Sequence, residues 1–265
     1  APMGPVSVEV PIDIQHGLVE SGEIEPLQVN DILPNDEDIE ELASMLEKAK
    51  RPLLWIGGGA RHAQAEVQKL AGMGFGVVTS IQGRGVVPEG DDCSLGAYNL
   101  YPNIEEFYQT CDAMLVVGSR LRGNETLKYK LKLPSPLYQV DVDPTLSKRP
   151  YQPEKTVIGD SKLVLSKLAA KLGNRMNIDE NFWSEIKKAR QISMENLSKN
   201  FIQPYENLVS AIQASNGGDF VWVRDVTISN STWGNRAIHI QSPKDGLHAV
   251  GGGIGQGLQM AIGAA

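Results

Sequence analysis

Short apolar runs alternate with amphipathic stretches along the middle of the chain. The runs that indicate buried strands are 52–56, 76–79, 113–117, 137–142 and 155–158. The stretches that indicate helices, because their apolar residues recur at helical spacing, are 35–49, 60–70, 104–110 and 161–172. Such alternation is typical of βαβ units. It predicts an α/β fold, a Rossmann-like parallel sheet with helices on both faces, followed by a partial second α/β unit.

The two ends of the chain follow other patterns. Residues 6–10 alternate apolar and polar side chains, which predicts a half-buried strand. A long helix is predicted over 179–200, and a strand over 219–223 opens the second α/β unit. The final residues, 251–265, form a glycine-rich loop and a helix that is apolar all round. Helices of that kind are normally buried inside a domain, which favours the hypothesis that the chain is part of a longer protein.

Composition and charge exclude several classes of protein. The 265 residues are 41% hydrophobic, which excludes wholesale disorder, and the net charge of −7 argues against nucleic-acid or anionic-membrane binding. The charge is uneven, because residues 1–47 hold 12 acids and no Lys or Arg. The two cysteines, Cys93 and Cys111, form no metal motif, so a reducing cytosol is the expected compartment. Neither a transmembrane helix nor a signal peptide is predicted.

Glycines, acids and an arginine follow the predicted strands, where parallel sheets bind ligands. The loop Gly57–Gly59 could offer backbone N–H groups to a phosphate, or serve as a plain tight turn. Asp141 could accept ribose hydroxyls, or be a solvated acid at a strand end. Arg120 could pair with a phosphate through two hydrogen bonds. The candidate nucleotide-binding residues are Gly57, Gly58, Gly118, Arg120, Asp141 and Asp160.

No complete set of catalytic side chains is visible. The histidines His16, His62, His239 and His248 lack metal-ligand spacing, and no GxSxG, P-loop, HExxH or Cys–His signature occurs. No catalytic residue and no metal ligand is therefore assigned from the sequence.

Several segments, in order, resemble thiamin-diphosphate-dependent enzymes of the acetolactate (acetohydroxyacid) synthase type. They are GPVSVEVPID at 4–13, RPLLWIGGG at 51–59, DAMLVVGSR at 112–120, VDVDP at 140–144 and the glycine-rich helix that contains AIGA at 261–264. The resemblance implies the following division: 1–13 end a pyrimidine-binding domain, 14–34 are a linker, 35–175 are a central nucleotide-binding-like domain, 176–216 are a helical connection, and 217–265 begin a diphosphate-binding domain.

The same resemblance implies a thiamin diphosphate site. Aligned on AIGA, Ile254 stands where the family has a bulky apolar residue that bends the cofactor, and the carbonyls around Gly252 and Ile254 would hold its aminopyrimidine ring. The family's Gly-Gln-His is replaced within 225–230. The implied thiamin diphosphate contacts are Gly252, Ile254, Gly255, Ser229 and Asn230. The family's activating Glu and its magnesium-binding GDG…N motif lie outside the matched segments.

The central domain of that family holds FAD in acetohydroxyacid synthases, ADP in oxalyl-CoA decarboxylases, and no nucleotide in some other members. Arg120, Asp141 and Asp160 match its nucleotide-contacting positions. The synthases' GxRFDDR is GSRLRGN here, so Arg122 replaces an acid. The residues are therefore compatible with several alternatives for this site: FAD, ADP, a more anionic nucleotide or CoA, or no ligand.

The resemblance implies a decarboxylase or carboligase that acts on a 2-oxo acid with thiamin diphosphate and Mg²⁺. The parent protein would release CO₂ and pass the remaining fragment to a second carbonyl compound or to a proton. It is expected to be a homodimer or homotetramer, and the 265 residues alone are expected to be inactive. The alternative is a non-catalytic module that binds FAD or ADP. An NAD-dependent dehydrogenase is disfavoured by the absence of GxGxxG.

Overall fold

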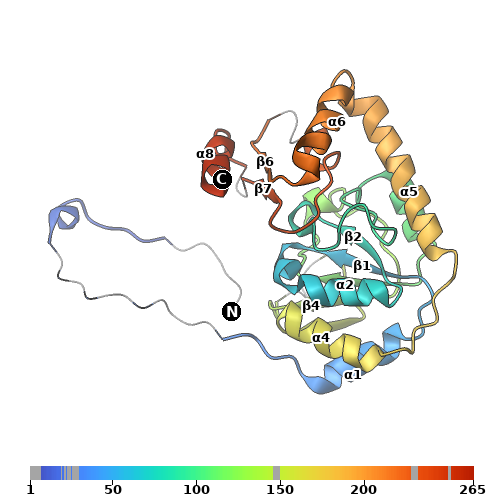
Figure 1. Cartoon of the computed structure of the whole chain (residues 1–265). Coiled ribbons are helices and arrows are strands. Elements are labelled where there is room, and N and C mark those ends of the chain that lie inside the picture. The colour runs from blue at the N-terminus through green and yellow to red at the C-terminus, as the bar shows by residue number, and fades with distance from the viewer. Residues whose placement is uncertain are drawn as a thin grey trace.

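A parallel five-stranded sheet forms the centre of the computed structural model, which describes residues 7–18, 20, 22, 25, 30–145, 150–227, 232–249 and 252–265 (Figure 1). The strand order is β2-β1-β3-β4-β5, and every pair of neighbours is parallel. The strands are β1 Pro52–Ile56, β2 Gly76–Thr79, β3 Ala113–Val117, β4 Leu137–Asp141 and β5 Lys155–Ile158. The helices of this domain and its connection are α1 Asp36–Leu46, α2 Gln64–Gly72, α3 Pro102–Tyr108, α4 Ser161–Leu172 and α5 Phe182–Leu197.

Helices cover both faces of the sheet, which confirms the predicted fold class. All residues of β1 and β3 are buried, as expected for strands covered on both sides. Leu54 and Ile56 belong to a core with α1, α2 and α4, whereas Leu53 and Trp55 pack with α3 and α5. Figure 1 shows α1 and α4 side by side and α5 along the opposite face. The two free cysteines, Cys93 and Cys111, are buried in the first and the second core respectively.

The strand order creates a topological switch point between β1 and β3. From β1 the chain moves outward to β2, and it then returns across β1 to form β3 on the other side. Connections that diverge in this way leave a crevice at the carboxyl ends of the two strands, where doubly wound folds bind ligands. Gly57 follows β1 and Gly118 follows β3, so both glycines lie at this crevice.

Side-chain caps fix where two of the helices begin. The Oδ1 atom of Asn35 accepts a hydrogen bond from the backbone N of Glu37 at 2.8 Å, and acids fill the first turn of α1. The carboxylate of Asp160 accepts from the backbone N of Lys162 and of Leu163 at the start of α4. Caps of this kind satisfy N–H groups that have no partner within the helix, and they agree with the helix starts predicted at 35 and 161.

A smaller unit follows the central domain. The predicted helix over 179–200 is α5 followed by a π-helical turn, Ser198–Ile202, and α6 Glu206–Ala214 comes next. The strands β6 Trp222–Arg224 and β7 Gly246–His248 pair in parallel, and α8 Gly257–Ala264 contacts both. Trp222 Nε1 donates to the carbonyl of Gly234 at 2.9 Å and so ties β6 to the loop that precedes β7.

One expectation about the ends of the chain, the strand over 6–10, is wrong in this structure. Residues 7–10 form no strand, and Val8 is 79% exposed, because no strand in the described part of the chain pairs with them. The apolar helix α8 lies largely exposed, with Leu258 and Ile262 at 68% and 71%, and the hypothesis that the chain is part of a longer protein stays a prediction. The helix predicted from residue 60 begins only at Gln64, after a 3₁₀ turn over Gly58–Ala63. Within the described ranges no helix is long and apolar enough to span a bilayer.

Candidate functional site

A cavity of about 200 Å³ opens at the carboxyl edge of the sheet, beside the switch point. Segments that follow β1, β3, β4 and β5 all contribute to it, which is the arrangement that parallel sheets use to bind ligands. Its lining residues are Gly59, Gly118, Arg120, Val140, Asp141, Val142, Gly159 and Ser161. The structure therefore brings together Gly118, Arg120 and Asp141 of the six predicted nucleotide contacts. We refer to this space as the sheet-edge cavity.

Glycine is required where the ends of β1 and β3 cross. A Cβ atom on Gly57 would lie 2.2 Å from the carbonyl oxygen of Gly118, and Gly118 itself has φ +59°. The N–H of Gly57 donates to the carbonyl of Val117 at 2.9 Å, and that of Gly59 donates to Gly118 at 3.0 Å. These two amides are thus engaged within the fold. Neither Gly57 nor Gly58 lines the sheet-edge cavity, and their contact with a nucleotide stays a prediction.

Asp160 forms hydrogen bonds next to the sheet-edge cavity without lining it. Besides capping α4, its Oδ2 atom lies 2.7 Å from Nε2 of His62. The neighbouring Ser161 donates from Oγ to the carbonyl of Gly59 at 2.9 Å. Asp160 does not line the cavity, but the residues on either side of it do. The contact between His62 and Asp160 could not be predicted from a local pattern, because the two residues are 98 positions apart.

The chemistry of the sheet-edge cavity suits part of a nucleotide. Asp141 is partly buried at the end of β4, where a carboxylate can accept hydrogen bonds from ribose hydroxyls. Arg120 carries a planar guanidinium group that can bind a phosphate through two hydrogen bonds. The cavity volume is below the roughly 300–1,000 Å³ of sites for drug-sized ligands. It therefore accommodates a nucleoside portion more readily than a whole dinucleotide.

The glycine-rich loop before α8 presents an open backbone. Gly252 and Gly255 have φ values of +73° and +90°, and a Cβ on either would have no atom within 4 Å. The N–H of Gly255 donates to both carboxylate oxygens of Asp225, at 3.0 and 2.9 Å, which fastens the loop to the end of β6. Ile254 is 80% exposed. An exposed apolar side chain between accessible backbone groups fits the implied contact with thiamin diphosphate.

The remaining implied contacts, Ser229 and Asn230, lie outside the residues that the structure describes. Within the described ranges, no three His, Cys, Asp or Glu side chains come together as a possible metal site.

A second cavity, of about 360 Å³, lies between the central domain and the unit that contains β6 and β7, and it is larger than the sheet-edge cavity. We call it the interdomain cleft. Its lining residues are Ile81, Gln82, Asn99, Leu100, Arg122, Asn124, Glu125, Val226, Asn235, Arg236, His248, Ala249 and Gly252. Arg120 and Arg122 thus line different cavities, and Arg122 Nη2 lies 3.1 Å from Glu125 Oε1. Sequence reasoning missed this cleft, apart from Gly252 and the replacement at Arg122.

A neutral histidine lies in the cleft. Burial, followed by the charges of Arg224, Arg61 and Arg84, lowers the pKa of His248 to about 4, so its imidazole is uncharged at neutral pH. The Nε2 atom of Gln82 lies 2.9 Å from Nε2 of His248. Because an amide nitrogen only donates, this ring nitrogen accepts the hydrogen bond.

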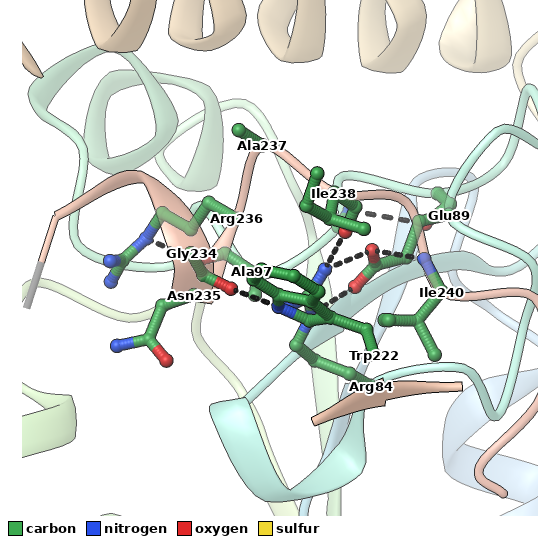
Figure 2. Close-up of polar contacts among 12 residues, drawn as sticks. Arg84, Glu89, Ala97, Trp222, Gly234, Asn235, Arg236, Ala237, Ile238 and Ile240 are labelled. Carbon is green, nitrogen blue, oxygen red and sulfur yellow. Dashed lines mark hydrogen bonds and ion pairs between the residues drawn. The ribbon is translucent and has the colours of Figure 1, made fainter. Parts of the chain in front are cut away.

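A buried ion pair joins the two sides of the cleft (Figure 2). Nε and Nη2 of Arg84 donate to Oε1 and Oε2 of Glu89, each at 2.6 Å. Arg84 also donates to the carbonyl of Ile238, and Glu89 Oε2 accepts from the backbone N of Ile240 at 3.0 Å. Arg190 of α5 also donates to the backbone carbonyl of Glu89 at 2.9 Å, which fixes Glu89 against that helix. The pair therefore holds the segment before β7 against the central domain.

Comparisons with known proteins agree with the resemblance noted in the sequence. Residues 39–168 match the family described as "Thiamine pyrophosphate enzyme, central domain". Acetolactate synthase 2 of Nicotiana tabacum is 24% identical over 99% of this chain and 42% of its own length. The acetolactate synthase of Mycobacterium bovis is 24% identical over 98% of the chain and 45% of its own length. The acetolactate synthase isozyme 1 large subunit of Escherichia coli is 26% identical over 99% of the chain and 48% of its own length. The chain thus spans less than half the length of these relatives.

Proposed function

We propose that this chain, whose residues 39–168 match the central domain of thiamine pyrophosphate enzymes, belongs to an acetolactate synthase-like enzyme that cleaves and joins carbon–carbon bonds of 2-oxo acids. The similarity along 98–99% of the chain to several acetolactate synthases carries this proposal. The proposal includes the division into domains predicted from the sequence, with the central domain at 35–175. It also includes an assembly of two or four identical subunits.

The glycine-rich loop is the part of the proposed thiamin diphosphate site that this chain contributes. Its support is the open backbone at Gly252 and Gly255, together with the exposed side chain of Ile254. Thiamin diphosphate supplies the electron sink for cleavage of the bond next to the carbonyl, while the protein binds and orients it. Asp225 holds the loop in place through the N–H of Gly255. Mg²⁺ and the diphosphate would need further residues, and Ser229 and Asn230 are our candidates for the diphosphate.

We expect the isolated 265-residue chain to form no acetolactate from pyruvate, even with thiamin diphosphate and Mg²⁺. The physical reason is that a cofactor of this kind works only when both of its ends are held and oriented. The residues proposed here supply only one loop and the two candidates Ser229 and Asn230. Product formation followed by NMR is the measurement. Acetolactate above a protein-free blank would contradict the expectation.

The sheet-edge cavity is the proposed nucleotide site, with ADP and FAD as the candidate ligands. We expect Arg120→Ala to weaken nucleotide binding about tenfold, because a charge-assisted pair with phosphate is lost. Asp141→Asn should weaken it less, since the amide still offers one acceptor oxygen. Isothermal titration with each nucleotide measures both effects. Visible absorbance of the purified chain would identify a flavin.

The matched control is Arg175→Ala, which removes a half-exposed arginine paired with Glu47. It should leave nucleotide affinity unchanged. Affinity that is equal in Arg120→Ala and in the unsubstituted chain would place the ligand elsewhere. Nucleotide binding by a protein that contains this chain, without any thiamin-dependent activity, would instead favour the non-catalytic module.

A further inference from the structure

The interdomain cleft is lined by an arginine, Arg236, that forms no ion pair with a carboxylate in the part of the chain that the structure describes. Nε of Arg236 donates to the carbonyl of Ala97 at 2.8 Å, and the guanidinium carbon lies 5.8 Å from the ring centre of Tyr101. Among the described residues no carboxylate pairs with it. Figure 2 shows its guanidinium group extending away from the Arg84–Glu89 pair, on the same side as the side chain of Asn235. Arg236 lines the interdomain cleft and also a second cavity, of about 410 Å³, that Tyr101 and Thr232 help to line.

The surroundings of Arg236 are strongly positive. Burial lowers its pKa, and the nearby charge of Arg84 lowers it further. Burial also lowers the pKa of Arg224 to about 10, with Arg84 and Arg236 as the next causes. The carboxylate of Glu89 is already engaged by Arg84 and by a backbone N–H. Buried cations repel one another, and an anion bound beside Arg236 would reduce that repulsion, although neither Arg84 nor Arg224 lines the cleft itself.

The rest of the cleft lining includes several hydrogen-bond donors. Arg122 brings a second guanidinium group, and Asn124 and Asn235 bring side-chain amides. The lining contains one carboxylate, Glu125, and this is the partner of Arg122 at 3.1 Å. Asn235 Oδ1 already accepts from Arg224, so its amide nitrogen is the group left for a ligand. A donor-rich cleft with an excess of positive charge matches an anion with several acceptor oxygens.

We propose that the interdomain cleft binds an oxyanion, the carboxylate or phosphate group of a small molecule, with Arg236 as its main ligand and Arg122 at the rim. Guanidinium groups suit this role because their planar donors match two oxygens of such a group at once. The bound group would lie beside Gly252, at the edge of the glycine-rich loop, and apart from the sheet-edge cavity. This site does not depend on the proposed thiamin chemistry, because the binding is measured without thiamin diphosphate.

The test uses the 265-residue chain in a buffer without chloride. Pyruvate and inorganic phosphate are titrated separately by calorimetry, with the thermal unfolding midpoint as a second readout. We expect at least one of them to bind, and we expect Arg236→Gln to weaken that binding about tenfold. Added salt should weaken it as well, because exposed charges are screened. Arg175→Gln is the control and should bind like the unsubstituted chain.

The outcomes separate the sources of the anion. Binding of pyruvate alone identifies a carboxylate site, and binding of phosphate alone identifies a phosphate site. If Arg236→Gln does not fold, Arg122→Gln replaces it, since the side chain of Arg122 is 55% exposed and its loss leaves the core intact. The proposal is overturned if neither anion binds, or if the folded variant binds as tightly as the Arg175→Gln control.

Discussion

Replacing Glu89 by glutamine is expected to lower the free energy of unfolding by about 3–5 kcal/mol. The side chains of Arg84 and Glu89 are only 5% and 4% exposed, so removing the carboxylate charge leaves a buried guanidinium group without its counter-ion. The carboxylate also accepts the backbone N–H of Ile240, so the change weakens a contact between the two sides of the interdomain cleft. Urea unfolding followed by far-ultraviolet circular dichroism measures the loss.

The same loop provides a matched control for this ion pair. Asp92 lies 3.0 Å from Lys187, with both side chains more than half exposed, so Asp92→Asn should change stability by no more than about 0.5 kcal/mol. The double variant Arg84→Met with Glu89→Leu removes both charges and should recover much of the loss. A Glu89→Gln variant as stable as Asp92→Asn would show that the buried pair does not hold the two sides together.

Gly57→Ala is expected to disrupt the sheet-edge cavity and to abolish nucleotide binding there. The added Cβ would lie 2.2 Å from the carbonyl oxygen of Gly118, so one of the two backbones must move. Gly118 lines the cavity, and its displacement changes the shape of the site. Overpacking of this kind costs about 1–3 kcal/mol of stability. Chemical unfolding and nucleotide titration of the same variant measure the two consequences.

Gly72→Ala serves as the control for the glycine substitution. Gly72 is the last residue of α2, and a Cβ there has no atom within 4 Å. Alanine at that position should be neutral or add up to about 1 kcal/mol, because it restricts the unfolded chain. Equal stability and equal nucleotide affinity in the two variants would mean that the crossing of β1 and β3 tolerates a side chain.

The sheet could be predicted because its strands are continuous apolar runs. β1 and β3 coincide with the predicted bounds, since strands buried on both faces contain no polar interruption. The predicted helix at 161–172 matches α4, which Asp160 caps and Gly173 follows at φ +52°. The strand predicted at 6–10 rests on alternation alone. Alternation makes a strand only where a second strand supplies hydrogen bonds.

Part of the sheet-edge cavity was equally predictable. Gly118, Arg120 and Asp141 follow neighbouring strands, and carboxyl ends of parallel strands meet at one edge of a sheet. Contacts between distant segments leave no local pattern, which is why the bond between Glu89 and Ile240, 151 positions apart, could not be predicted. Arg236 was missed for the same reason, because its surroundings come from segments that only the tertiary fold brings together.

The positions of the two cysteines give each face of the sheet its own chemical reporter. Burial raises the pKa of the Cys93 thiol to about 11 and that of Cys111 to about 12, so almost no thiolate exists at neutral pH. Alkylation of either thiol therefore requires a local opening of the surrounding core. Modification of Cys93 records opening on the side of α1, α2 and α4, and modification of Cys111 records opening on the side of α3 and α5. Peptide mass mapping after timed exposure to iodoacetamide would then measure the rate of local opening on each face of the sheet without any introduced label.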